Sequence, residues 1–114
     1  MRILFTTAPN FGHFHPMVPI ARSAVAAGHD VAFASPADFV PTIEQAGFRA
    51  IAAGFDRGGR SLGELLPEWL TIREDLRAPW TIPNYFAGVL APAMAHDLIE
   101  HCRSWMPDVL VRES

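Results

Sequence analysis

Alternating blocks of apolar and polar residues divide the chain into short predicted elements. Residues 3–6 form an apolar run of strand-forming residues, which the following Ala-Pro-Asn-Phe-Gly ends. Apolar residues at helical spacing then follow Pro16 and stop at Gly28, a residue that favours helix termination. The pattern therefore predicts a strand, a loop and a helix in this order, with His13 in the loop.

The next stretch repeats the alternation. Runs rich in β-forming residues at 29–34 and 48–51 predict a second and a third strand. A helix over residues 38–46 is expected between them, ending at Gly47. Strands alternating with helices are typical of an α/β fold with a doubly wound, Rossmann-like parallel sheet.

The second half of the chain is less regular. Residues 52–63 are rich in Gly and Arg and predict a long surface loop. A helix is expected over residues 64–77, with Pro79 and Pro83 as breaks behind it.

One longer helix and one strand are expected near the carboxyl terminus. Apolar residues at helical spacing predict a helix over residues 86–105, with a kink at Pro92. Residues 109–111 predict a fourth, buried strand. In the strand order 3-2-1-4 of doubly wound sheets, the first and fourth strands are neighbours.

The composition limits the class of protein. The chain has 114 residues, of which 50% are hydrophobic and 18% charged, as in a globular protein with one domain or part of one. A net charge of -3 argues against nucleic acid as a partner. The only cysteine, Cys102, permits no internal disulfide, and the apolar run at the start is too short for a signal peptide or a membrane span. We expect a cytoplasmic protein without a membrane span.

The last strand indicates that more protein follows. A parallel sheet needs cover on both faces, and no helix comes after residues 109–111 in this chain. We therefore expect the sequence to be the first part of a longer protein, or one subunit of a split protein.

Candidate chemistry lies in the first loop, which has neither the glycine pattern of dinucleotide binders nor that of a P-loop. It carries Gly12-His13-Phe14-His15-Pro16 just before a helix N-terminus. Such a terminus favours a nearby anion and a neutral imidazole, the form that a general base needs. A loop histidine can also be a surface or capping residue, and both interpretations remain open. A metal is not favoured, because the loop has no cysteine, carboxylate or third histidine.

The expected strand order adds a carboxylate to His13. Glu113 follows the fourth strand, so both side chains should emerge at one crevice, where the carboxylate could orient the imidazole. Glu113 could equally be a solvated strand end, and Arg112 could occupy or neutralise the crevice.

Most aromatic residues of the chain are expected in the core, but some are candidates for an apolar pocket. Phe11 and Phe14 flank His13, and Trp80 and Phe86 bound a connector broken by proline.

The motifs resemble those of a known family. Residues 3–31, which include Gly12-His13-Phe14-His15-Pro16 and Ala27-Gly28-His29-Asp30-Val31, resemble the opening of GT-B fold, family 1 glycosyltransferases. Residues 45–48 and 107–114 fit the same family. The similarity is strongest to bacterial enzymes of antibiotic biosynthesis that glycosylate macrolides, other polyketides and glycopeptides.

The resemblance implies a function. It implies that residues 1–114 are the N-terminal, acceptor-binding domain of a GT-B fold, incomplete at its end, and that the C-terminal donor-binding domain is absent. The family transfers sugar with inversion from a nucleotide sugar to a hydroxyl of a hydrophobic natural product, without a metal or other cofactor. By motif position the general base is His13 and its partner Glu113. Phe11, Phe14, Trp80 and Phe86 are then expected at the acceptor, and Gly12 near the donor phosphate.

Two alternatives remain open. The chain could be a non-catalytic binding or partner module, or half of a split glycosyltransferase. A homodimer is also left open. As a glycosyltransferase domain, the chain alone is expected to bind acceptor and to be inactive, because half of the active site is missing.

Overall fold

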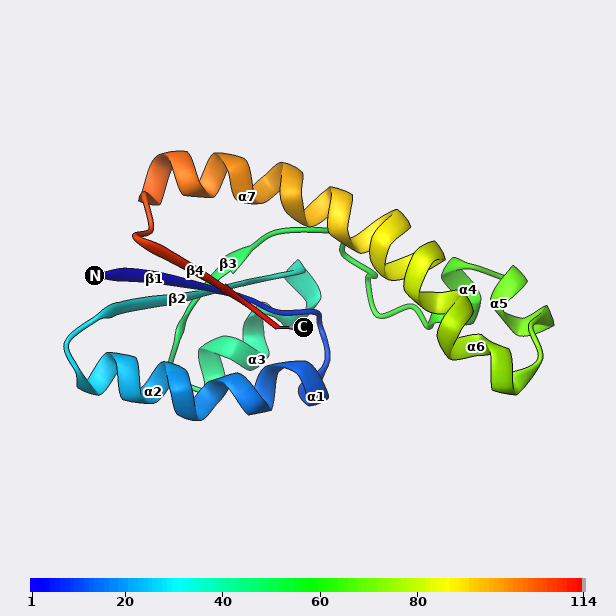
Figure 1. Cartoon of the computed structure of the whole chain (residues 1–114), viewed down its shortest axis with the longest axis horizontal. Helices are drawn as coiled ribbons and strands as arrows, with labels where there is room; N and C mark the ends of the chain where they lie inside the picture. Colours follow the sequence, from blue (N-terminus) through cyan, green and yellow to red (C-terminus); the bar gives the residue numbers. More distant parts are fainter. Residues whose placement is uncertain (114) are drawn as a thin grey trace.

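Four parallel strands form the sheet at the centre of the molecule (Figure 1). The computed structural model describes residues 1–113. The sheet has the order β3-β2-β1-β4, and every neighbouring pair is parallel, which confirms the predicted order and the α/β, Rossmann-like fold class. The strands are β1 (Arg2–Thr6), β2 (Asp30–Ser35), β3 (Arg49–Ala52) and β4 (Val109–Arg112).

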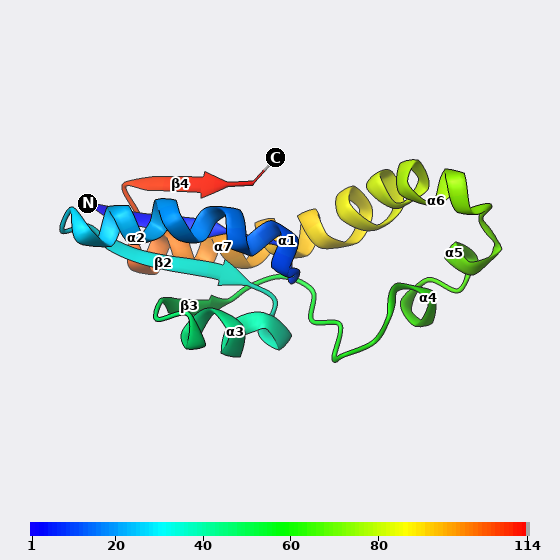
Figure 2. The same ribbon diagram turned by 90° about the horizontal axis from the view of Figure 1, so that it is seen from below.

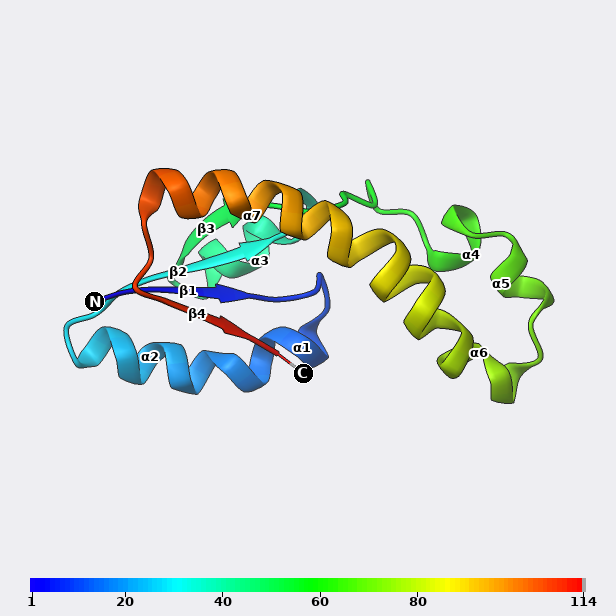
Figure 3. The ribbon, with the colours of Figure 1, turned by 45° about the horizontal axis from the view of Figure 1, so that its top comes forward.

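Helices cover both faces of the sheet, with α2 and α3 on one face and α7 on the other (Figures 1 and 3). Toward α2 the core is aromatic, and Phe33 lies at its centre with ring centroids 4.9 Å from Phe5 and 5.2 Å from Phe14. The face toward α7 carries small strand residues such as Ala32 and Ala34, which let Met94 and its neighbours on the helix pack closely. The helices are α2 (Val18–Ala26), α3 (Val40–Gln45) and α7 (Ala91–Trp105).

The first helix begins earlier than predicted. Asn10 is the N-cap of α1 (Phe11–Phe14), since its side chain accepts a hydrogen bond from the Gly12 amide. A 3-10 helix, η1 (His15–Met17), then joins α1 to α2. His13 therefore lies in a helical turn and not in a loop, which corrects the prediction. The end at Gly28 is confirmed, with a φ of 86° that suits glycine.

The second crossover follows the prediction closely. After β2, a 3-10 helix η2 (Ala37–Phe39) leads into α3, and Gly47, with a φ of 89°, ends the helical stretch. β3 begins two residues later.

The predicted helix over residues 64–77 is wrong. This stretch forms three short helices, α4 (Leu62–Leu65), α5 (Glu68–Thr71) and α6 (Glu74–Thr81). Pro67 disfavours helical geometry in the residue before it, and Leu66 accordingly leaves the helix with φ −129° and ψ 81°.

The breaks predicted at Pro79 and Pro83 are also absent. α6 continues through Pro79 into a π-helix, η3 (Ile82–Leu90), and from there into α7 (Figures 1 and 3). Side chains satisfy carbonyls of this irregular stretch, because Thr81 Oγ1 donates to the Arg77 carbonyl and Asn84 Nδ2 donates to that of Trp80. At the expected kink, helix type changes from π to α just before Pro92.

β4 is in its predicted place but is not buried. Val109 and Leu110 are 41% and 45% exposed. Figure 2 shows the reason, since β4 lies at one edge of the sheet and β3 at the other. None of the helices within residues 1–113 is long and apolar enough to cross a bilayer.

Substitution of Phe33 should test the aromatic core. Phe33 is fully buried among other rings, so Phe33→Ala should lower the free energy of unfolding by about 3–5 kcal/mol. Urea denaturation would measure the change. Ile20→Ala, at a side chain that is 62% exposed, is the control and should change stability by no more than about 0.5 kcal/mol. Equal losses in the two variants would contradict this description of the core.

Candidate active site

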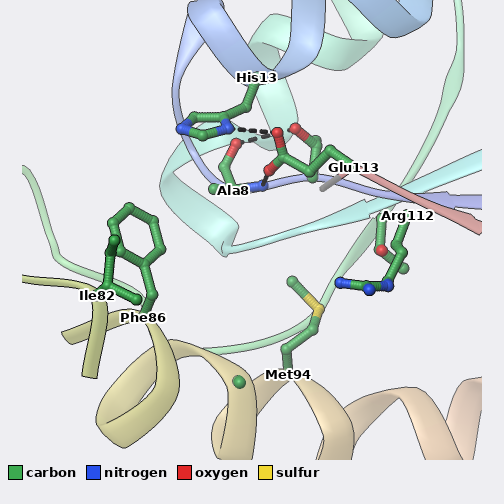
Figure 4. A pocket seen from close by; sticks show the side chains of 10 residues that line it. Ala8, His13, Ile82, Phe86, Met94, Arg112 and Glu113 are labelled. Carbon is green, nitrogen blue, oxygen red and sulfur yellow. Dashed lines mark hydrogen bonds and ion pairs between the residues drawn. The ribbon is translucent and has the colours of Figure 1, made fainter. Parts of the chain in front are cut away.

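His13 and Glu113 meet at the carboxyl edge of the sheet. β1 pairs with β4 so that Thr6 lies opposite Arg112, and Glu113 comes directly after the fourth strand. His13 Nδ1 forms a hydrogen bond with Glu113 Oε2 (Figure 4). The two side chains that were expected at one crevice are therefore in direct contact.

The first turn of α1 holds His13 in place. The carbonyl of Asn10 accepts hydrogen bonds from the amides of His13 and Phe14, at 3.2 and 3.0 Å. The ring of Phe14 is 1% exposed and packs edge-on against Phe33 and Phe39. The turn that carries His13 is thus capped by Asn10 at its start and held by the buried Phe14 at its end. The role of Asn10 was missed from sequence, although an Asn just before a helix is a typical N-cap.

Glu113, which follows β4, forms hydrogen bonds with two residues that follow β1. Its Oε1 accepts a hydrogen bond of 2.9 Å from the Ala8 amide, and its Oε2 contacts His13. An ionised carboxylate can only accept, so the proton in the contact belongs to Nδ1 of the imidazole. In a neutral imidazole the other nitrogen, Nε2, then carries a lone pair, and Figure 4 shows it turned away from Glu113. This geometry presents a hydrogen-bond acceptor that could take up a proton.

An open cavity of about 580 Å³ lies beside the pair. Its apolar wall comes from the helical stretch that runs from η3 into α7, and the ring of Phe86 lies 6.2 Å from that of His13 between centroids (Figure 4). The lining residues are Thr6, Thr7, Ala8, His13, Ile82, Phe86, Ala91, Met94, Arg112 and Glu113. The cavity can accept a molecule that is mostly apolar and carries a polar group near the imidazole.

Arg112 lies at the other side of this cavity. Side chains alternate along a strand, so Arg112 turns toward Met94 on α7 while Glu113 turns toward α1 (Figure 4). Among the described residues, the ion-pair partner of Glu113 is His13 and not Arg112. Arg112 therefore lines the cavity without neutralising the carboxylate.

The chain is similar to antibiotic glycosyltransferases. No protein-family profile matches it. It is 31% identical over 131 residues to the 10-deoxymethynolide desosaminyltransferase of Streptomyces venezuelae, across 99% of this chain and 31% of that protein. The TDP-daunosamine transferase DnrS of Streptomyces peucetius is 28% identical over 131 residues, across 99% and 30%. The crystal structure of glycosyltransferase VinC in complex with DTDP is 34% identical and superposes with a TM-score of 0.70, across 99% of this chain and 29% of that one.

The chain has the fold of the N-terminal domain of GT-B glycosyltransferases and is similar to them in sequence over nearly its whole length. It spans about a third of the length of the curated relatives that it matches.

Three of the four aromatic residues expected at the acceptor of this GT-B domain do not line the His13 cavity. Phe14 is in the core, and Phe11, which is 56% exposed, packs against Phe39 and borders a separate groove. Trp80 is half-buried on α6 and is not among the residues that line the cavity. Phe86 lines the cavity, and its contact with an acceptor stays a prediction. Ile82, four residues before it, also lines the cavity and was missed, although this spacing signals one helix face.

That Gly12 lies near the donor phosphate stays a prediction. Its amide donates to Asn10 Oδ1 at 2.8 Å and caps the helix, so this amide is not free for a donor phosphate. Within the part of the chain that the structure describes, no three His, Cys, Asp or Glu side chains gather as metal ligands.

Loss of the helix cap should destabilise the turn that carries His13. Asn10→Ala leaves the Gly12 amide without its partner, and we expect a loss of about 1 kcal/mol in the free energy of unfolding, measured by urea denaturation. Asn10→Asp keeps an acceptor oxygen and should retain most of the stability. An Asn10→Ala variant as stable as the unsubstituted chain would show that the cap contributes nothing.

Proposed function

We propose that the protein containing this chain transfers a sugar from a nucleotide-sugar donor to a hydroxyl of a hydrophobic natural-product acceptor. The observation that carries the proposal is the His13–Glu113 pair, with Nε2 of the imidazole turned away from the carboxylate at the edge of an apolar cavity. The relatives support it, since their names specify transfer of desosamine to 10-deoxymethynolide and transfer from TDP-daunosamine, and VinC binds DTDP.

In the proposed reaction His13 is the general base. Nε2 takes the proton of the acceptor hydroxyl as its oxygen attacks the anomeric carbon of the donor. The bond between that carbon and the phosphate oxygen breaks, and the nucleoside diphosphate leaves with the electron pair. Attack on the face opposite the leaving group inverts the configuration. Glu113 holds the ring in the required tautomer and stabilises the imidazolium that forms.

The cavity suits the acceptor in this proposal. Ile82, Phe86 and Met94 offer an apolar surface to a polyketide, macrolide or similar skeleton. We propose that the donor is held mainly by a second domain outside this chain. In this proposal the reaction needs no metal or other cofactor and takes place in the cytoplasm.

Substitution of the base should abolish most of the turnover. In the full-length enzyme, His13→Ala should lower kcat by roughly 10²–10⁴-fold, because proton removal by a positioned base contributes about that much. The matched control is His15→Ala, since His15 is exposed two residues further and does not line the cavity. Full activity of His13→Ala would remove the base assignment. Acceptor binding without any transfer by the unsubstituted protein would instead support a non-catalytic binding module.

The carboxylate should act through its charge as well as its hydrogen bonds. Glu113→Gln keeps one acceptor oxygen but cannot stabilise an imidazolium by charge, so we expect kcat to fall at least about tenfold. KM for the acceptor should change little, since both oxygens of Glu113 are engaged by the Ala8 amide and by His13. Steady-state kinetics would measure both, and an unchanged kcat would limit Glu113 to a structural role.

A further inference from the structure

Arg57 connects separate segments at the carboxyl edge of the sheet. It lies in the loop of residues 53–61, between β3 and α4. One terminal nitrogen of its guanidinium donates to the Pro9 carbonyl at 3.1 Å, and Nε lies 3.7 Å from Asp38 Oδ2. The Arg57 and Asp38 side chains are only 31% and 19% exposed, so this ion pair is partly shielded from water.

Both partners of Arg57 border the turn that carries His13. Pro9 comes directly before Asn10, the N-cap of α1. Asp38 comes directly before Phe39, whose ring packs against Phe11 and Phe14 of α1 at 5.6 and 5.7 Å between centroids. The guanidinium therefore connects Pro9, the residue before the N-cap of α1, to η2, whose Phe39 packs against α1.

Tyr85 belongs to η3, the helical segment that forms part of the cavity wall, and the charge of Arg57 acts on its hydroxyl. Tyr85, 6% exposed, is the buried residue of η3, and its ring packs at 5.6 Å against Phe86. Its hydroxyl and Arg57 Nε are buried and make no hydrogen bond within the described part of the chain. Burial raises the pKa of the Tyr85 hydroxyl, the positive charge of Arg57 opposes this shift, and the negative charge of Asp38 adds to it.

The loop that carries Arg57 is itself anchored. The Ala53 amide donates to the Ser35 carbonyl at 2.9 Å, and the Gly54 amide donates to Asp97 Oδ2 on α7 at 2.8 Å. Gly54 has a φ of 91°, so the loop turns sharply at this point. The start of this loop is thus held to both β2 and α7.

We propose that Arg57 is a positioning residue that sets the separation between His13 and the Phe86 wall of the cavity. The proposal rests on the proposed function, in which this separation decides where the acceptor hydroxyl lies relative to Nε2. A guanidinium suits the task because its planar fork can donate in several directions at once, which a lysine ammonium at the end of a flexible stem does less well.

Nuclear magnetic resonance can test the geometry without any assay of transfer. A nuclear Overhauser effect between ring protons of His13 and Phe86 is expected in the unsubstituted protein, whose ring centroids are 6.2 Å apart. Arg57→Ala should abolish it with the circular dichroism spectrum unchanged, and Arg57→Lys should restore part of it. The matched control is Arg60→Ala, since Arg60 lies exposed in the same loop and its side chain donates to the Arg57 carbonyl. An unchanged effect in Arg57→Ala would overturn the proposal.

Kinetics of the full-length enzyme provide the second measurement. We expect kcat of Arg57→Ala to fall roughly 10–100-fold, because small displacements of a reacting group are costly, while Arg60→Ala stays within about twofold. An unchanged kcat in Arg57→Ala would also overturn the proposal.

If Arg57→Ala does not fold, Asp38→Asn provides a second variant. It removes the charge that faces the guanidinium and should lower both kcat and the nuclear Overhauser effect. Absence of transfer by the unsubstituted enzyme would contradict the proposed function, while the resonance experiment would still decide the role of Arg57.

Discussion

Parallel pairing of β1 with β4 places the ends of both strands at the same edge of the sheet, and the candidate chemistry depends on the register of that pairing. With Thr6 opposite Arg112, the next residue, Glu113, reaches both the Ala8 amide and the imidazole of His13. A slip by one residue would exchange the faces of Arg112 and Glu113. A cation would then face the imidazole, and the carboxylate would lie toward α7.

The unequal faces of the sheet support this edge from both sides. Toward α2 the core is built from large rings, and Phe14 extends it to the turn that carries His13. Toward α7 the strands present Ala32 and Ala34, so the helix lies close and Met94 reaches the cavity. The site therefore lies between two different layers. The aromatic layer supports the turn that carries His13, and the aliphatic layer brings Met94 to the cavity.

The cavity wall is part of one continuous helical stretch, which runs from α6 through η3 into α7 and contains Pro79 and Pro83. Local preference would end the helix near Pro79 and Pro83, yet the chain continues through a π-helical segment into α7. Burial of Tyr85, which is 6% exposed, favours the continued segment, whereas Phe86 remains 38% exposed at the cavity.

Sequence alone determined the strand order and the meeting of His13 with Glu113, because apolar periodicity locates strands and the right-handed crossover leaves few ways to order them. It also located the ends of helices at Gly28 and Gly47, where backbone sterics act locally. Only the tertiary structure decided that Phe14 is core while Phe86 lines the cavity. The side chains are identical, and their roles differ because distant segments cover one ring and leave the other open.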